Sequence, residues 1–435
     1  MESPDLPARP AAFGRYVAEA QAEGVLVVQP RMGFSDPAEM RAGLLATKGV
    51  PTRSAGTLTV DSYTRVGDEA AVLRALRSGV HLNGYPITSY SSPTTQEMLA
   101  GVRDSAFPVQ VRHGSARPQR IFAALSLAGI DATEGGPVSY CLPYGRTPLA
   151  ESVHNWRESC EFFARQRGPQ LEPHLETFGG CMLGQLCPPG LLVALSVLEA
   201  LFFRQYGIRS ISLSYAQQTH AEQDEQAVRA LRRLASELLG GCEWHVVLYT
   251  YMGLFPQTAQ GATRLLQESA ALAVRSGAAR LIVKTEAEAH RIPTVAENVR
   301  ALHTAADAAR AARASPSTPG EDDPDSPVYR EARALVEAVL GLDDDIGEAL
   351  LRAFARGLLD VPFCLHTDNA GRTRSYINAQ GRLMWSEVGA MPISPSAPGS
   401  TPPRLTAAGL YDALAHVQRR HDHELSRTNR YALTP

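Results

Sequence analysis

The chain has 435 residues, is 44% hydrophobic and carries a formal net charge of −3. This length suits one large domain with an appendage, or two domains, and the near-neutral charge gives no indication of nucleic acid or an anionic membrane as a partner. No apolar run reaches the ~18 residues of a membrane span, and the polar, Pro-rich N-terminus lacks a signal-peptide core. We therefore expect a cytoplasmic protein. Its scattered cysteines, which form no CxxC pair, are expected to be free thiols.

Short apolar runs alternate along the chain with amphipathic helical stretches. The runs predict strands at 24–30, 56–62, 81–87, 108–114, 131–136, 174–180, 210–216, 244–251 and 280–285. They are continuously apolar rather than alternating, which is typical of a parallel sheet covered on both faces. The pattern predicts an α/β fold of the (β/α)8 TIM-barrel type with a C-terminal α+β extension. Since there are nine candidates, at least one lies outside the barrel, and the sequence does not say which.

The predicted domain organisation has four parts. These are an N-terminal segment at 1–23, a TIM-barrel catalytic domain at 24–312, a linker or exposed loop at 313–328, and a helical and irregular extension at 329–435. The linker is predicted from the Pro-, Ser- and acid-rich run "ASPSTPGEDDPDSP".

Five predicted strands end at or next to a charged residue: Arg31, Arg112, Glu134, Glu176 and Lys284. In a TIM barrel the carboxyl ends of the strands form the mouth of the active site. Each charge alone is equally well explained as a solvated or ion-paired rim residue, but five at one face favour a ligand. Cationic groups suit carboxylates or phosphates, and glutamates suit an ammonium group or proton transfer. The set fits an amino acid with an additional carboxylate.

Two tyrosines follow Glu134 in "TEGGPVSYCLPYGR". Tyr140 and Tyr144 lie in a Pro-containing loop, where ordinary rim packing is one explanation. Behind a glutamate at a barrel mouth, we interpret them as hydroxyls that face the substrate.

These motifs resemble one family. The stretches that carry the resemblance are "QPRMG", "TVDSYTR", "LNGYP", "VRHG", "EGGPVSYCLPY", "ETFGG", "CPPG", "YMGLFPQ", "IVKTEAEA" and "VPF…DNAGR". In their order and spacing, from about residue 24 to 395, the chain resembles the epsilon (large) subunit of glutamate mutase, also called methylaspartate mutase.

The resemblance implies an isomerase that depends on adenosylcobalamin and interconverts L-glutamate and (2S,3S)-3-methylaspartate through radicals. It implies catalytic residues: Glu134, Tyr140, Tyr144 and Glu176. It implies substrate-binding residues: Arg31, Arg112, Glu134, Tyr140, Tyr144 and Phe178. It implies residues on the cofactor side: Lys284, Glu288, Asn83, Gly84 and Asn369.

The resemblance also implies a partner. Cobalamin-binding subunits carry a D-x-H-x-x-G motif whose histidine ligates cobalt, and no such run occurs in this sequence. We therefore expect no metal ligand here, a separate small cobalamin-binding subunit over the barrel mouth, and a homodimer of large subunits within a heterotetramer.

One position departs from the expected pattern. The resemblance implies a third substrate-binding arginine, four residues before the position of Asn83. In this sequence that position is occupied by Gly79. If the segment is a strand, His81 or Arg77 lies on the same face and could substitute, although Arg77 is equally a helix-end charge. Three hypotheses stay open: the mutase, a non-catalytic or substrate-shifted relative, and a Schiff-base lyase or aldolase that uses Lys284.

Overall fold

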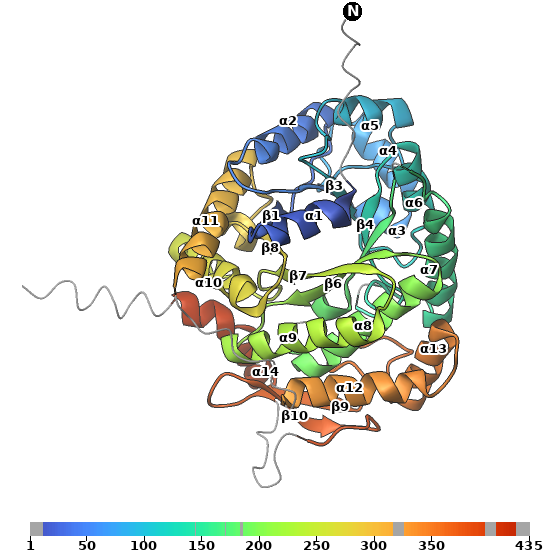
Figure 1. The fold of residues 1–435 in the computed structure, drawn as a ribbon, viewed down its shortest axis with the longest axis vertical. Coiled ribbons are helices and arrows are strands. Elements are labelled where there is room, and N and C mark those ends of the chain that lie inside the picture. The colour runs from blue at the N-terminus through green and yellow to red at the C-terminus, as the bar shows by residue number, and fades with distance from the viewer. Residues whose placement is uncertain are drawn as a thin grey trace, which may run out of the picture.

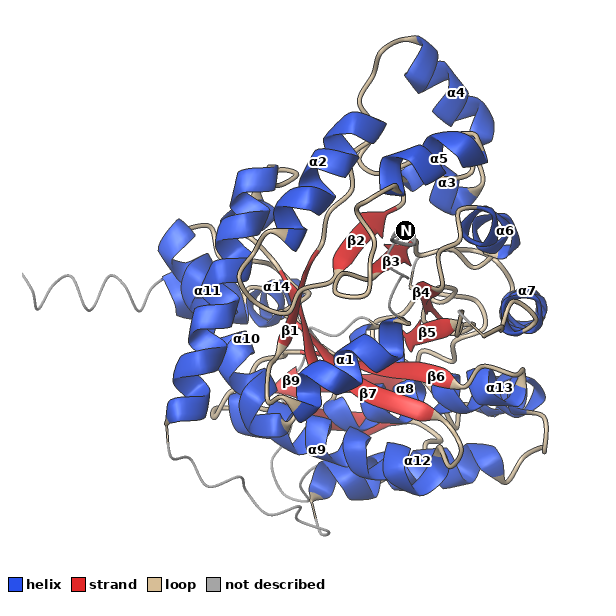
Figure 2. Cartoon of the chain, turned by 45° about the horizontal axis from the view of Figure 1, so that its top comes forward, coloured by secondary structure: helices blue, strands red, loops and turns tan. Residues whose placement is uncertain are grey.

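The computed structural model describes residues 12–143, 145–169, 171–182, 186–315, 326–395 and 406–422. Parallel strands curl into a barrel that is surrounded by helices (Figures 1 and 2). The barrel strands are β1 (Val27–Pro30), β2 (Gly56–Thr59), β3 (Val109–Arg112), β4 (Ala132–Gly135), β5 (His174–Thr177), β6 (Ser210–Ala216), β7 (Glu243–Tyr249) and β8 (Arg280–Val283). The predicted TIM-barrel class is confirmed.

The sheet follows chain order from β2 to β8 and then β1. Its two edges meet at one parallel bridge between Val28 and Ser54. There, Val28 N donates to Arg53 O at 3.1 Å and Ala55 N donates to Val28 O at 3.2 Å. The bridge joins β1 to the segment that precedes β2 and closes the ring.

The candidate strand outside the barrel is 81–87. This segment forms only one bridge, between Val60 and Tyr85, so the strand predicted there is wrong. Gly84 packs directly on the backbone after β2, where an added Cβ would lie 2.6 Å from Asp61 N. The segment thus buttresses the end of β2.

Helices follow each strand and cover the outside of the barrel (Figure 2). The barrel helices are α2 (Pro37–Lys48), α6 (Gln119–Leu127), α7 (Leu149–Ala164), α8 (Pro189–Gln205), α9 (Ala221–Leu238), α10 (Ala259–Ser276) and α11 (Val295–Ala314). Between β2 and β3 lie α3 (Ser62–Val66), α4 (Glu69–Arg77) and α5 (Ser92–Leu99). Short 3-10 turns follow β5 and β8, η1 (Gly179–Cys181) and η2 (Glu286–Ala289).

Helix α1 (Phe13–Ala22) lies across the amino end of the barrel (Figure 1). The Phe13 ring lies 4.9 Å from the ring of His174 and 4.9 Å from the guanidinium carbon of Arg280. Those two residues begin β5 and β8. Gly14 permits the close approach, since a Cβ there would lie 2.2 Å from Ser210 Oγ. The predicted N-terminal segment therefore contains the helix that closes this end.

The C-terminal part contains α12 (Pro327–Leu340), α13 (Ile346–Arg356), the antiparallel pair β9 (Thr373–Ile377) and β10 (Leu383–Val388), and α14 (Ala407–Leu414). Helix α12 packs against α8 and α9. Helix α8 is apolar on nearly all sides, as expected of a helix between a barrel and an outer layer. Most of the predicted linker, 316–325, lies outside the described residues, and the domain boundaries stay a prediction.

None of the described helices combines the length and apolar character needed to cross a membrane. All six cysteines have free thiols, as predicted.

Candidate active site

Three predicted site residues meet at the carboxyl ends of β3, β4 and β5. Arg112 is the last residue of β3, and Glu134 on β4 pairs in register with Glu176 on β5. Their exposures are only 5%, 2% and 0%. Buried charges are tolerated when other charges and hydrogen bonds compensate them, so the partners of these three groups define the site.

Both oxygens of Glu134 have partners. Arg112 Nε lies 2.8 Å from Oε2, and the hydroxyl of Tyr249, at the end of β7, lies 2.8 Å from the same oxygen. The Tyr140 hydroxyl donates to Oε1. Nη1 of Arg112 is buried and has no hydrogen-bond partner among the described residues. A guanidinium with a free donor in a buried site suits an anionic ligand.

Glu176 is held by a second guanidinium. Its Oε2 pairs with Arg280 and accepts from Gln110 Nε2 and Ser212 Oγ, each at 3.1 Å. Its Oε1 accepts from the Tyr249 hydroxyl. Burial alone would raise the pKa of Glu176, but the charges of Arg280 and Arg112 outweigh it and hold the pKa below its ordinary value. Glu176 is therefore a fixed negative charge at neutral pH.

A second cluster follows β8 and joins Lys284, Glu288 and Arg31. One oxygen, Glu288 Oε1, lies 3.0 Å from Lys284 Nζ and 2.8 Å from Arg31 Nη1. The structure thus brings Lys284 and Glu288 together as the sequence predicts. The Glu288 carboxylate also pairs with the guanidinium of Arg31.

Burial and the neighbouring charges together set the pKa values of Lys284 and Glu288. Burial lowers the pKa of Lys284 to about 8, against the opposing charge of Glu288. Burial would raise the pKa of Glu288, but Lys284 and Arg31 bring it down to about 2. At neutral pH Lys284 and Glu288 are therefore both charged, and Lys284 loses its proton not far above neutrality.

Arg65, on α3, is a site residue that the sequence analysis missed. It packs over Gly114, where an added Cβ would lie 2.8 Å from Arg65 Cδ. Burial first, and then the charge of Arg65, lower the pKa of the adjacent His113 to about 3. Among the described residues the Arg65 guanidinium has no hydrogen-bond or ion-pair partner. It is a free cation beside the end of β3.

The segment around Gly79 lies elsewhere. Gly79 is exposed in a turn with φ +66° and no heavy atom within 4 Å of an added Cβ. Arg77 is the exposed last residue of α4, and His81 is also exposed. Figure 2 shows α4 projecting beyond the ring of helices. The strand alternation that would turn Arg77 or His81 toward the site does not exist, because no strand forms here.

Asn83 and Gly84 position the helix that carries Arg65. Asn83 Oδ1 accepts from Ser62 N at 2.9 Å, at the start of α3, and Gly84 packs on Asp61 N. Asn369 is engaged within its own loop, where it accepts from Val361 N and donates to Val361 O. The described contacts of these residues are structural, and their place on the cofactor side stays a prediction.

Phe178 lies between two tyrosines of the site. Its ring centroid is 5.0 Å from that of Tyr140 and 5.6 Å from that of Tyr249. Tyr144 lies outside the described residues, as do Leu183, Gly184 and Gln185 after η1.

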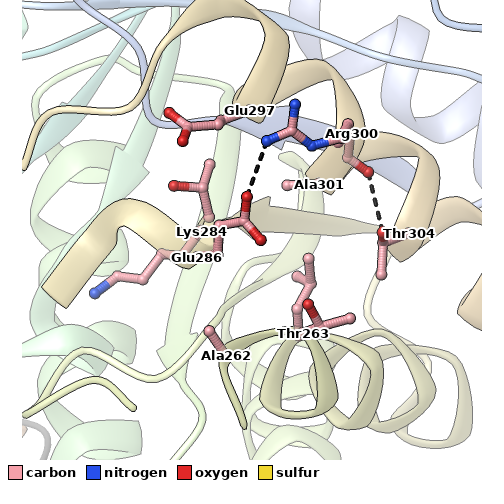
Figure 3. Close-up of a pocket in the computed structure, with 10 residues that line it drawn as sticks. Ala262, Thr263, Lys284, Glu286, Glu297, Arg300, Ala301 and Thr304 are labelled. Carbon is pink, nitrogen blue, oxygen red and sulfur yellow. Dashed lines mark hydrogen bonds and ion pairs between the residues drawn. The ribbon is translucent and has the colours of Figure 1, made fainter. Parts of the chain in front are cut away.

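A pocket of about 160 Å³ lies between α10 and α11, beside the end of β8. Figure 3 shows an ion pair between Arg300 and Glu286 within it. Lys284 also lines this pocket, but its side chain extends away from that ion pair, and its Nζ pairs with Glu288. Among the described residues, no group of three or more His, Cys, Asp or Glu side chains could hold a metal ion.

Comparison with known proteins gives a family for this arrangement. The model of the methylaspartate mutase E chain (MutE) matches residues 6–412. This chain belongs to that family.

Members of the methylaspartate mutase E chain family align along most of the chain. The glutamate mutase epsilon subunits of Yersinia enterocolitica and Escherichia coli O157:H7 are each 30% identical over 88% of this chain and 81% of their own. That of Halobacterium salinarum is 31% identical over 87% and 81%. A sialic acid synthetase from Leptospira borgpetersenii aligns with a TM-score of 0.38 and 8% identity over 71% of this chain and 90% of its own, too low to support an argument.

Proposed function

We propose that the chain is the large catalytic subunit of an adenosylcobalamin-dependent carbon-skeleton mutase that interconverts L-glutamate and (2S,3S)-3-methylaspartate. The observation that carries the proposal is the buried pair of Arg112 and Glu134, with an unused guanidinium donor and two tyrosine hydroxyls around it. Family membership supports the reaction type.

The substrate class follows from the charges at the mouth. Among the described residues, Arg112 and Arg65 each have donors that no residue uses, and Arg31 pairs with the carboxylate of Glu288. Three guanidinium groups suit the two carboxylates of a dicarboxylic amino acid. Glu134 then binds the ammonium group and accepts a proton from it, while Tyr140 orients the Glu134 carboxylate.

Lys284 and Glu288 fit the ribose of an adenosyl group. An ammonium group and a carboxylate 3.0 Å apart offer a donor and an acceptor to vicinal hydroxyls. The Glu288 side chain is 21% exposed, so a ligand at the mouth can reach it. When bound, adenosylcobalamin supplies the radical chemistry. The chain contributes binding, orientation and exclusion of water.

The partner in this proposal is a small cobalamin-binding subunit with a D-x-H-x-x-G motif. Support comes from exposed apolar side chains on the segments that follow β2, β7 and β8. They are Tyr63, Val66, Leu254 and Ile292, with exposures of 42%, 70%, 40% and 53%. Apolar groups around a mouth favour a protein surface above it.

An NMR substrate assay tests the proposal. The chain is mixed with a cognate small subunit and adenosylcobalamin, and L-glutamate, (2S,3S)-3-methylaspartate and close analogues are offered in turn. Conversion of glutamate to methylaspartate is the expected result. Turnover of an analogue alone would support the substrate-shifted alternative. Complex formation without any turnover would support the non-catalytic one.

A Schiff-base reaction remains as a second candidate because burial lowers the pKa of Lys284 to about 8. The ion pair with Glu288 opposes it by stabilising the ammonium form. Borohydride trapping distinguishes the two reactions. We expect no covalent adduct on Lys284 with either amino acid.

A further inference from the structure

Tyr249 is the side chain that links the two buried glutamates. It ends β7 and is fully buried. Its hydroxyl lies 2.8 Å from Glu134 Oε2 and also contacts Glu176 Oε1. Because β4 and β5 place the two glutamates in register, one phenol from another strand reaches both carboxylates.

A phenol has one hydrogen to donate, so Tyr249 can serve only one carboxylate at a time. Burial raises the pKa of Tyr249 well above its ordinary value, so the hydroxyl keeps its proton. The two carboxylates therefore compete for one donor.

The surroundings of Glu176 decide this competition. Its Oε2 already has three donors, from Arg280, Gln110 and Ser212. The charges of Arg280 and Arg112 keep Glu176 ionised, which makes its Oε1 a permanent strong acceptor. With the Tyr249 hydrogen turned toward Glu176, the phenol oxygen presents a lone pair to Glu134.

We propose that Tyr249 is a positioning residue that makes Glu134 a better base, by accepting a hydrogen bond from Glu134 once Glu134 is protonated. The inference rests on the proposed function, in which Glu134 takes a proton from the ammonium group of the substrate. In that step an N–H bond of the substrate breaks and an O–H bond forms at Glu134 Oε2. The new O–H donates to Tyr249, Tyr249 donates to Glu176, and Arg280 balances the remaining charge.

The opposite role for Tyr249 is donation to Glu134. If Tyr249 chiefly donates to Glu134, it stabilises the ionised carboxylate and makes Glu134 a weaker base. The two roles predict opposite effects of Tyr249→Phe. This variant keeps the ring, which packs against Phe178 and lies 4.9 Å from the guanidinium carbon of Arg112, and removes only the hydroxyl.

The first test uses the ligand-free chain. The infrared C=O band of protonated carboxyl groups is titrated, and Glu134→Gln identifies the component that belongs to Glu134. We expect Tyr249→Phe to move the midpoint of that component down by about one pH unit, because the protonated form loses its acceptor. A midpoint that rises or stays fixed overturns the proposal.

The matched control is Tyr215→Phe. Tyr215 is also fully buried, on the neighbouring β6, and its hydroxyl donates to Asp224 at 2.8 Å. Tyr215 and Ser212 are an odd number of positions apart on β6, so their side chains point to opposite faces of the sheet. Ser212 faces Glu176, and Tyr215 therefore faces away from it. We expect Tyr215→Phe to leave the Glu134 component unchanged, and an equal shift in both variants overturns the proposal.

The second test uses the enzyme reconstituted with its partner and cofactor. We expect Tyr249→Phe to lower kcat about tenfold with little change in KM, and to move the acid limb of kcat/KM to lower pH. If Tyr249→Phe shifts the infrared midpoint but the reconstituted wild type shows no turnover, the result contradicts the proposed function and supports the role of Tyr249 beside Glu134. Normal turnover without the infrared shift counts against the role of Tyr249 alone.

Discussion

In the proposed site, Arg65 and Arg77 are both candidates for a third substrate-binding cation, and their surroundings differ. Arg65 packs beside Gly114 at the end of β3, whereas Arg77 is exposed at the end of α4. We expect Arg65→Ala to weaken binding of L-glutamate to the chain by about 2 kcal/mol, or roughly 30-fold, since a charged hydrogen bond is lost. Calorimetry measures the effect.

Arg77→Ala is the control for Arg65→Ala, because it removes the same charge. We expect it to change the affinity by less than about twofold, as for an exposed charge. A larger loss in Arg77→Ala than in Arg65→Ala would return the role to the 77–81 segment.

In the proposed site, Glu288 competes with the substrate for Arg31, because its carboxylate lies 2.8 Å from that guanidinium. We expect Glu288→Gln to tighten the binding of L-glutamate to the cofactor-free chain by about three- to tenfold, a modest gain suited to a partly exposed pair. Glu286→Gln removes an equal charge from the same turn, where Glu286 pairs with Arg300, and is expected to have no such effect. Weaker binding by Glu288→Gln would show that the carboxylate supports the substrate site instead.

Lys284 gives the mouth a pH-dependent charge. Its pKa of about 8 means that it is cationic below this pH and neutral above it. The affinity for glutarate, a dianion without an amine, is therefore expected to fall as the pH rises through about 8. Lys284→Arg remains charged throughout this range, so its profile should stay flat, and a decline in both proteins would assign the titration to another group.

Sequence reasoning found the charged residues that stand at strand ends, since a TIM barrel sends those positions to one mouth. Arg112, Glu134 and Lys284 are of this kind. It missed Tyr249 because a tyrosine at the end of an apolar run resembles ordinary core. It also missed Arg280, the ion-pair partner of Glu176. Arg280 is the first residue of its strand and lies at the amino end of the barrel, where no site residue was expected.

At the scale of elements, α1 acts as a plug for the amino end of the barrel. Phe13 is fully buried against His174 and Arg280. We expect Phe13→Ala to lower the free energy of unfolding by about 3–4 kcal/mol through lost packing, measured by urea denaturation. Glu19→Ala changes an exposed position of the same helix and should cost little. Equal losses in both variants would mean that the packing of Phe13 does not set the effect.

The segment 81–87 shows where element prediction failed. Its apolar residues suit a strand, and Leu82, Tyr85 and Ile87 are indeed buried. They are buried by packing against the end of β2, with only one bridge to the sheet. A pattern of burial alone does not reveal whether a segment joins a ladder of hydrogen bonds.

At the scale of the whole molecule, the barrel could be predicted because the strand–helix unit repeats along the chain, and the family could be predicted from the order and spacing of its motifs. The placement of the C-terminal extension could not. Helix α12 covers α8 through contacts between residues far apart in sequence, and Asp360 binds the backbone N–H groups of Gly371, Arg372 and Thr373. Such long-range contacts leave no periodic pattern.

The position of α1 also bears on the end of the barrel from which a ligand approaches. Phe13 and Arg280 pack together at the amino end, so in the proposed function the substrate and the partner both approach from the carboxyl ends of the strands. Substrate binding and coverage by the partner would then take place at the same end of the barrel. In the proposed assembly the substrate would bind before the partner covers this end, and the product would leave after the partner dissociates, which gives a defined order of binding.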